Sequence, residues 1–222
     1  MVKKVIIAIS DDDTKKIVYR AAKNRFGEKQ VLVCSNSTEL YEQAKYVKDT
    51  AVIIDKFFFG YIISNRYVRL RVINETLLTY FVEIGECSPF FGMRVRLLGA
   101  TGYIPDIEVD EAFEIAMRRI QGGEEIFPDD VHDPVKKNIS RTDKRCINEV
   151  TKKEMSVGIY LSMGRGQKEI CNLTGMKPAT VSLHVHRLFR KIGYKKPQDL
   201  LLLDKRTYFF SENDGGNFAY QD

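Results

Sequence analysis

The sequence predicts two domains, an α/β domain followed by a small all-α domain. The first prediction rests on five short apolar segments, rich in β-branched residues, that alternate with helical periodicity through residues 1–121. Such alternation is typical of a doubly wound, five-stranded parallel sheet covered by helices on both faces. The second prediction rests on cap and turn signals after residue 150, which separate four short helices.

The elements of the α/β domain follow from these runs. Segments 4–9 and 50–55 are apolar without polar alternation, as in strands buried on both faces. Strands are expected at 4–9, 31–34, 50–55, 76–84 and 102–104. Helices are expected from the capping run 10–13 to about Gly27, at 37–47 with Ser37 as its cap, and at 61–73, 89–98 and 110–120.

Composition then divides the rest of the chain. Residues 122–145 have few apolar side chains, two prolines and mixed charge, so they are expected to link the α/β domain to a helical domain at 146–208. Residues 209–222 are polar and contain glycine, which predicts a flexible tail.

The composition of the chain indicates a globular protein of the cytoplasm. Of its 222 residues, 44% are hydrophobic and 29% charged. The apolar runs are far shorter than the ~20 residues of a membrane span, and the first residues do not resemble a signal peptide. Four cysteines lie scattered without C-x-x-C spacing, which favours reduced thiols over a zinc site.

Charge is unevenly distributed. Residues 150–206 carry twelve Lys and Arg against four Asp and Glu, a net charge of +8. Because the whole chain carries +5, the remainder is slightly acidic. A basic lobe beside an acidic one suits a nucleic-acid module joined to a sensor or partner module.

The basic lobe contains the signals of a helix-turn-helix. A capping box at Thr151 and Glu154 starts one helix, a second runs from Gln167 to about Leu173, and Pro178 opens a third. In the third helix one stripe is apolar and expected to be buried, namely Val181, Val185, Leu188 and Ile192. The opposite face is polar and basic, as in helices that enter a DNA groove.

Residues 150–194 resemble the C-terminal DNA-binding domain of the LuxR/NarL family of bacterial transcription regulators. The match is free of gaps and includes VTKKE, GRGQKEI and TVSLHVHRLFRKIGY. It implies base-edge contacts from Ser182, Leu183 and His186. It implies phosphate contacts from Lys168, Thr180, Arg187, Arg190 and Lys191. It also implies a homodimer in which a fourth helix contributes Leu200, Leu201 and Leu203.

The α/β region in turn resembles a response-regulator receiver domain, with Asp55 at the position of the phosphoacceptor. The rest of the expected site is degenerate. Ile9 and Ser10 stand at the acidic pair, which Asp11 and Asp12 reach only by a shift in alignment. Asp106 replaces the lysine, where a carboxylate would repel a phosphoryl dianion. The hydroxyl position falls within 82–85.

We therefore expect a degenerate receiver that is not switched by phosphorylation and needs no cofactor, with Mg²⁺ required only if the receiver is functional. The aromatic cluster of residues 57–59 and Tyr61 is expected by default in the core. The alternatives are a cover over the vestigial pocket and an apolar docking patch. Segment 89–98 and the helix at 110–119 lie where receivers commonly dimerise.

These patterns predict a sequence-specific transcription regulator that binds double-stranded DNA as a homodimer. No Gly-rich phosphate loop, catalytic triad or metal cluster suggests an enzyme. Asp11 and Asp12 are expected to cap a helix rather than hold a metal ion. Two alternatives stay open: a conventional regulator phosphorylated at Asp55, and a sigma-like or adaptor protein. RNA polymerase or another regulator would then be a partner.

Overall fold

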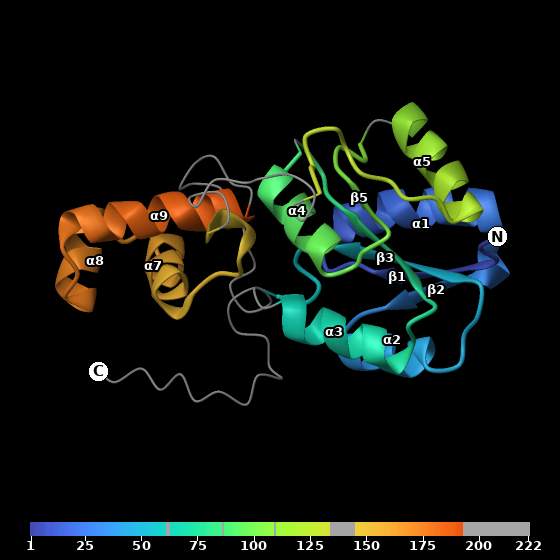
Figure 1. Ribbon diagram of the computed structural model, residues 1–222, viewed down its shortest axis with the longest axis horizontal. Helices are drawn as coiled ribbons and strands as arrows, with labels where there is room; N and C mark the ends of the chain where they lie inside the picture. The colour runs from blue at the N-terminus through green and yellow to red at the C-terminus, as the bar shows by residue number, and fades with distance from the viewer. Residues whose placement is uncertain (61–62, 86, 109, 134–144, 193–222) are drawn as a thin grey trace.

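The computed structural model describes residues 1–60, 63–85, 87–108, 110–133 and 145–192. Five strands form one parallel sheet in the order β2-β1-β3-β4-β5, the flavodoxin-like order, which confirms the predicted fold class (Figure 1). The strands are β1 (Lys4–Ala8), β2 (Val31–Cys34), β3 (Thr50–Asp55), β4 (Leu78–Val82) and β5 (Gly102–Ile104).

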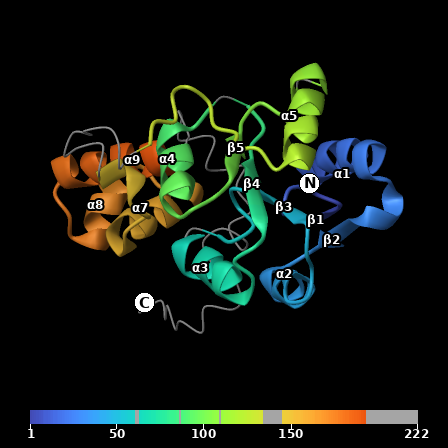
Figure 2. The same ribbon diagram turned by 45° about the vertical axis from the view of Figure 1, so that its right-hand side comes forward.

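Helices cover both faces of this sheet. They are α1 (Asp12–Phe26), α2 (Ser37–Ala44), α3 (Ile63–Ile73), α4 (Pro89–Leu97) and α5 (Asp110–Gly122), with a short 3₁₀ turn, η1 (Glu28–Gln30). Helices α1 and α5 lie on one side, and α2 and α3 on the other (Figures 1 and 2). In β1, Val5 and Ile7 join the core under α1 and α5, whereas Ile6 joins the opposite core with α2, α3 and α4.

The helix caps follow from local side chains. Asp11 accepts hydrogen bonds from the backbone and hydroxyl of Thr14 and so caps α1, as the acidic run predicted. In α2 the cap is Asn36, whose side chain accepts the N–H of Glu39, and the assignment to Ser37 was wrong by one residue. Asn36 has the extended backbone of a cap, whereas Ser37 is already helical.

The residues directly after α5 pack on the sheet. Ile126 forms a parallel bridge with Gly102, and Val131 is buried in the core beside α4. A Cβ atom on Gly92 of α4 would lie 2.6 Å from a methyl group of Val131, so only glycine allows this close approach. The first part of segment 122–145 therefore lies against the α/β domain, and residues 134–144 fall outside the described residues.

The helical domain contains α7 (Lys152–Ser162), α8 (Gln167–Thr174) and α9 (Pro178–Ile192). The capping box of Thr151 and Glu154 is present, as predicted. Gly175 ends α8 with a φ of 66°, a left-handed conformation that glycine adopts without strain. The predicted fourth helix, including Leu200, Leu201 and Leu203, and the predicted tail lie outside the described residues. None of the described helices is both long and apolar enough to cross a membrane.

Candidate nucleic-acid interface

Helix α9 divides into a buried and an exposed face. Val181, Leu188 and Ile192 are buried and Val185 is half-buried, as the apolar stripe predicted. Ser182, Leu183 and His186 are exposed, with 44% of Leu183 accessible to solvent. The three residues for which base-edge contacts are implied thus share the open face of α9.

One cap interaction and two hydrogen bonds of Gln167 hold the start of α8 in place against α9. Glu169 accepts the N–H of Gly166 and so caps the start of α8. Gln167, the first residue of α8, donates from its amide to the carbonyl oxygen of Pro178 and to the hydroxyl of Ser182. Through Gln167 the start of α8 is tied directly to the first turns of α9.

The five residues for which phosphate contacts are implied differ in exposure. Lys168 and Thr180 are exposed and Arg187 is half-buried. The guanidinium of Arg190 lies over the ring of Phe90 in α4, 4.3 Å from its centroid, so Arg190 engages the α/β domain. Lys168 and Thr180 are therefore the exposed members, and Arg187 is partly accessible.

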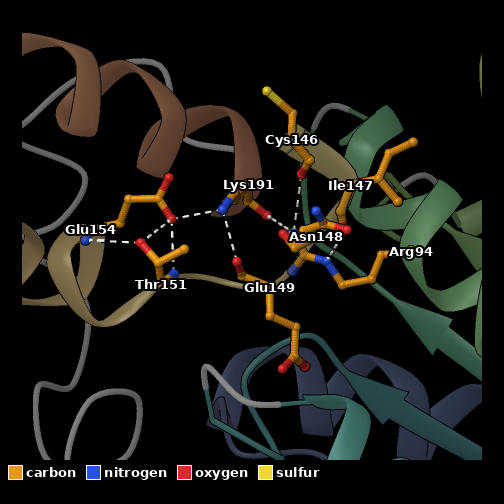
Figure 3. Close-up of polar contacts among 8 residues, drawn as sticks. All are labelled: Arg94, Cys146, Ile147, Asn148, Glu149, Thr151, Glu154 and Lys191. Atoms are coloured by element: carbon orange, nitrogen blue, oxygen red, sulfur yellow. Dashed lines mark hydrogen bonds and ion pairs between the residues drawn. The ribbon is translucent and has the colours of Figure 1, made fainter. Parts of the chain in front are cut away.

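Lys191 does not occupy the surface position that the resemblance implied. Its side chain is 3% exposed, and its ammonium donates to the Glu154 carboxylate at 2.6 Å and to the Glu149 carbonyl at 2.8 Å. The same Glu154 oxygen accepts the N–H of Thr151, so one carboxylate serves both the cap of α7 and the end of α9 (Figure 3). An ammonium held in this way is not available to a phosphate group.

The pKa of Glu154 reflects this arrangement. Burial by itself raises the pKa, but the hydrogen bond from Lys191, assisted by Thr151, leaves it below its ordinary value of 4.5. Glu154 is therefore ionised at neutral pH and completes a buried ion pair with Lys191.

Arg94 of α4 holds the helical domain through backbone groups. Its side chain is buried, and its guanidinium donates to the carbonyl oxygens of Ile147 at 2.6 Å and Asn148 at 3.0 Å. It also reaches the carbonyls of Cys146 and Lys191, both at 3.3 Å. Figure 3 shows that segment 146–149 lies between Arg94 on one side and the Lys191 ammonium on the other.

Aromatic and polar contacts extend this junction. Phe58 and Phe59 are buried in the core of the α/β domain, whereas Phe57 packs against the apolar cluster around Leu188 in the helical domain. The backbone N–H of Ser64, at the start of α3, donates to Glu149. The aromatic cluster predicted by default to be core thus divides between core and junction, and Tyr61 lies outside the described residues. Helix α4, expected where receivers dimerise, contacts α9.

The carboxyl end of β3 holds Asp55 in a closed set of hydrogen bonds. One oxygen accepts the backbone N–H and the hydroxyl of Ser10, both at 2.7 Å, and the N–H of Asp11. The other accepts the N–H groups of Phe57 and Phe58. Burial outweighs the hydrogen bonds and raises the pKa of Asp55 above its usual value. Both oxygens are engaged by the protein itself.

A buried ionic network occupies the neighbouring strand ends. Because Asp55 pairs with Val82 across β3 and β4, the next residues, Lys56 and Glu83, meet and form an ion pair. Glu83 also accepts the hydroxyls of Tyr103 and Ser88. Glu83 lies within 82–85, where a hydroxyl was expected, but its pairing with Lys56 was not predicted.

The other expected pocket residues lie apart from this network. Ile9 is fully buried in the apolar core, and Asp106 is exposed with a φ of 56°. Asp12 pairs with Lys15 at 2.8 Å, on the exposed side of α1. Within the described residues, no group of three or more His, Cys, Asp or Glu side chains is arranged to hold a metal ion.

Comparison with known proteins agrees with this architecture. No protein-family model matches the sequence. The Fimbriae Z protein of Escherichia coli (strain K12) is 25% identical over 134 residues, which cover 60% of this chain and 63% of that protein. The match thus spans less than two thirds of the length of this curated relative.

Solved structures of RcsB are similar over nearly the whole chain. RcsB from Salmonella enterica serovar Typhimurium, bound to a promoter in the presence of phosphomimetic BeF₃⁻, has a TM-score of 0.53 at 16% identity, covering 90% of this chain and 97% of that one. A structure of two RcsB dimers bound to two parallel DNAs has a TM-score of 0.51 at 18% identity, covering 91% and 97%. The chain therefore has the fold of these RcsB structures, an α/β domain with a five-stranded parallel sheet followed by a helical domain.

Proposed function

We propose that the protein is a cytoplasmic transcription regulator that binds a two-fold operator as a homodimer, with α9 in the major groove, and acts by binding rather than catalysis. The observation that carries this proposal is the open face of α9, where Ser182, Leu183 and His186 are exposed. Lys168 on α8 is also exposed, and Arg187 on α9 is partly accessible. Short side chains that reach base edges next to cations that reach phosphates are what a groove-reading helix requires.

The similar proteins support the same function. The RcsB structures contain DNA, and one of them contains two RcsB dimers on two parallel DNAs. The basic charge of residues 150–206 supplies the electrostatic attraction that such binding needs.

We further propose that DNA binding does not require phosphorylation of Asp55. Attack by an Asp55 oxygen on a phosphodonor would break the hydrogen bonds that Ser10 and Asp11, or Phe57 and Phe58, make to that oxygen. The cation beside it, Lys56, is already neutralised by Glu83. An added phosphoryl dianion would thus find no unpaired cation among these strand-end residues.

A selection of bound duplexes from random DNA tests the DNA-binding proposal. We expect one enriched motif with two-fold symmetry. Arg187→Ala should weaken binding to all duplexes and lower the salt slope of the binding constant by about one, because one phosphate contact is lost. Leu183→Ala should change the base preference without changing the salt slope. Arg25 at the end of α1 is exposed, and Arg25→Ala serves as the matched control. Equal affinity of all three variants and the wild type would exclude α9 as the reading helix.

Asp55→Asn tests the independence from phosphorylation. The amide keeps one acceptor oxygen, so the fold is expected to persist with reduced stability. The dissociation constant of the folded variant for DNA should match that of the wild type. Incubation with a small phosphodonor and Mg²⁺ should neither label the wild type nor change its affinity. If the wild type is labelled, Asp55→Asn abolishes the label and labelling tightens DNA binding, the protein is instead a conventional regulator phosphorylated at Asp55.

Sedimentation of the full chain with and without operator DNA tests whether the protein is a homodimer.

A further inference from the structure

The side chain of Gln167 reaches from the first residue of α8 to the beginning of α9. Its amide nitrogen lies 3.0 Å from the carbonyl oxygen of Pro178 and 2.5 Å from the hydroxyl oxygen of Ser182. Gln167 and Ser182 are both exposed, on the side of the turn where the open face of α9 begins. The contact therefore lies at the proposed DNA surface rather than in the core of the domain.

The chemistry of the three groups determines which one donates. A carbonyl oxygen can only accept, so the Gln167 amide must turn its nitrogen toward Pro178. An amide nitrogen carries two hydrogens and no acceptor site, so the Ser182 oxygen must accept the second hydrogen. The hydroxyl proton of Ser182 is thereby directed away from Gln167. Within the described residues, this is the hydrogen bond that engages the Ser182 side chain.

A serine hydroxyl normally contacts either donors or acceptors on a base, because it rotates to suit its partner. With one lone pair engaged by Gln167, Ser182 is oriented to offer its proton to the groove. We propose that Gln167 is a positioning residue that makes Ser182 act as a hydrogen-bond donor in base readout. This inference rests on the proposed function of α9.

The donor role specifies which bases Ser182 favours. Guanine presents N7 and O6 in the major groove, adenine presents N7 and thymine presents O4, and all of these accept a hydrogen bond. Cytosine presents an amino group that can only donate. Ser182 should therefore discriminate against cytosine at one position of each half-site, by about fivefold, the effect of a single neutral hydrogen bond.

Random-duplex selection with variants at both positions tests this assignment. Ser182→Ala identifies the base position that Ser182 reads, because discrimination is lost there. Gln167→Met has nearly the same length and cannot donate, so discrimination against cytosine at that position should fall by about fivefold. Gln167→Asn keeps the amide but shortens its reach, and should behave like Gln167→Met. Asn172→Leu, at an exposed position of α8, serves as the matched control with unchanged preference.

The position of the effect separates readout from a structural role. If Gln167 only ties α8 to α9 through Pro178, its replacement weakens binding to every duplex and leaves the preference at the Ser182 position intact, which overturns the inference. Gln167→Glu gives an independent check, because a carboxylate accepts the serine proton and should shift the preference toward cytosine. Failure of the wild type to bind any duplex would overturn the proposed function as well. If the wild type binds DNA selectively and Gln167→Met has the same base preference at the position that Ser182 reads, only this inference is overturned.

Discussion

Replacing Arg94 by Met should release the helical domain from the α/β domain. The Arg94 guanidinium donates to four carbonyl oxygens, three of which share the two hydrogens of one nitrogen, so about three full hydrogen bonds are lost. A bond from a charged donor contributes about 1.5–3 kcal/mol, but carbonyls freed by domain opening regain water. We therefore expect the free energy of opening to fall by about 3 kcal/mol, which raises the open population about 100-fold.

Amide hydrogen exchange measures this opening directly. In the full chain without DNA, amides of residues 146–150 and of the last turn of α9 should exchange about 100-fold faster in Arg94→Met than in the wild type. Amides of β1 and β3 should exchange at unchanged rates, because their hydrogen bonds lie within the sheet.

Arg96→Met is the matched control on the same helix. Arg96 pairs with Glu125, donates to the Val131 carbonyl and lies over Phe127, all within the α/β part of the chain. Its loss should leave exchange at residues 146–150 unchanged. Unchanged exchange there in Arg94→Met as well would refute the clamp, because the hydrogen bonds of Arg94 cannot be lost without consequence if they hold the domains together.

Three further substitutions test the stability of each domain by urea unfolding. Glu154→Gln should lower the free energy of unfolding of the helical domain by about 3 kcal/mol at neutral pH. Because the pKa of Glu154 is lowered in the folded state, this difference should be lost as the pH falls below 4.5. A difference independent of pH would contradict the ion pair. Gly92→Ala should lower the free energy of unfolding by about 1–3 kcal/mol, because the new Cβ atom meets Val131. Adding Val131→Ala should recover part of this loss, whereas fully additive effects of the two substitutions would exclude the clash. Tyr103→Phe should lower the free energy of unfolding by about 1–3 kcal/mol, because Glu83 loses a donor and the N–H of Ser88 loses its acceptor. An unchanged midpoint of urea unfolding would show that water replaces the hydroxyl.

The regular part of the fold could be predicted because its signals are local. Apolar strands such as 4–9 and 50–55 are buried on both faces, and the capping box at Thr151 specifies the start of α7 from neighbouring residues. The open and buried faces of α9 also follow from helical periodicity. The cap at Asn36 was missed because Ser37 beside it has similar cap preference, and only backbone conformation separates them.

The charged residues of the candidate site were harder to predict, since their partners are distant in sequence. Lys191 has the positive charge expected of a phosphate contact, but its ammonium forms a buried hydrogen bond with Glu154, 37 positions earlier in the sequence. Lys56 and Glu83 meet only through the register of β3 and β4. Their identities are visible in the sequence, whereas the pairing is a property of the sheet.

Arg94 recognises the main chain of residues 146–148, and this has a consequence for genetics. Carbonyl oxygens are the same in every amino acid, so the side chains of this segment carry none of the information that Arg94 reads. No exchange of a side chain within 146–148 can therefore compensate for the loss of Arg94, although Cys146 and Ile147 are themselves buried. Pairwise covariation between homologues would not report the hydrogen bonds of Arg94 to this segment, for the same reason. Detecting it genetically requires changes that move the backbone, such as an insertion or deletion within 146–148, rather than exchanges of side chains.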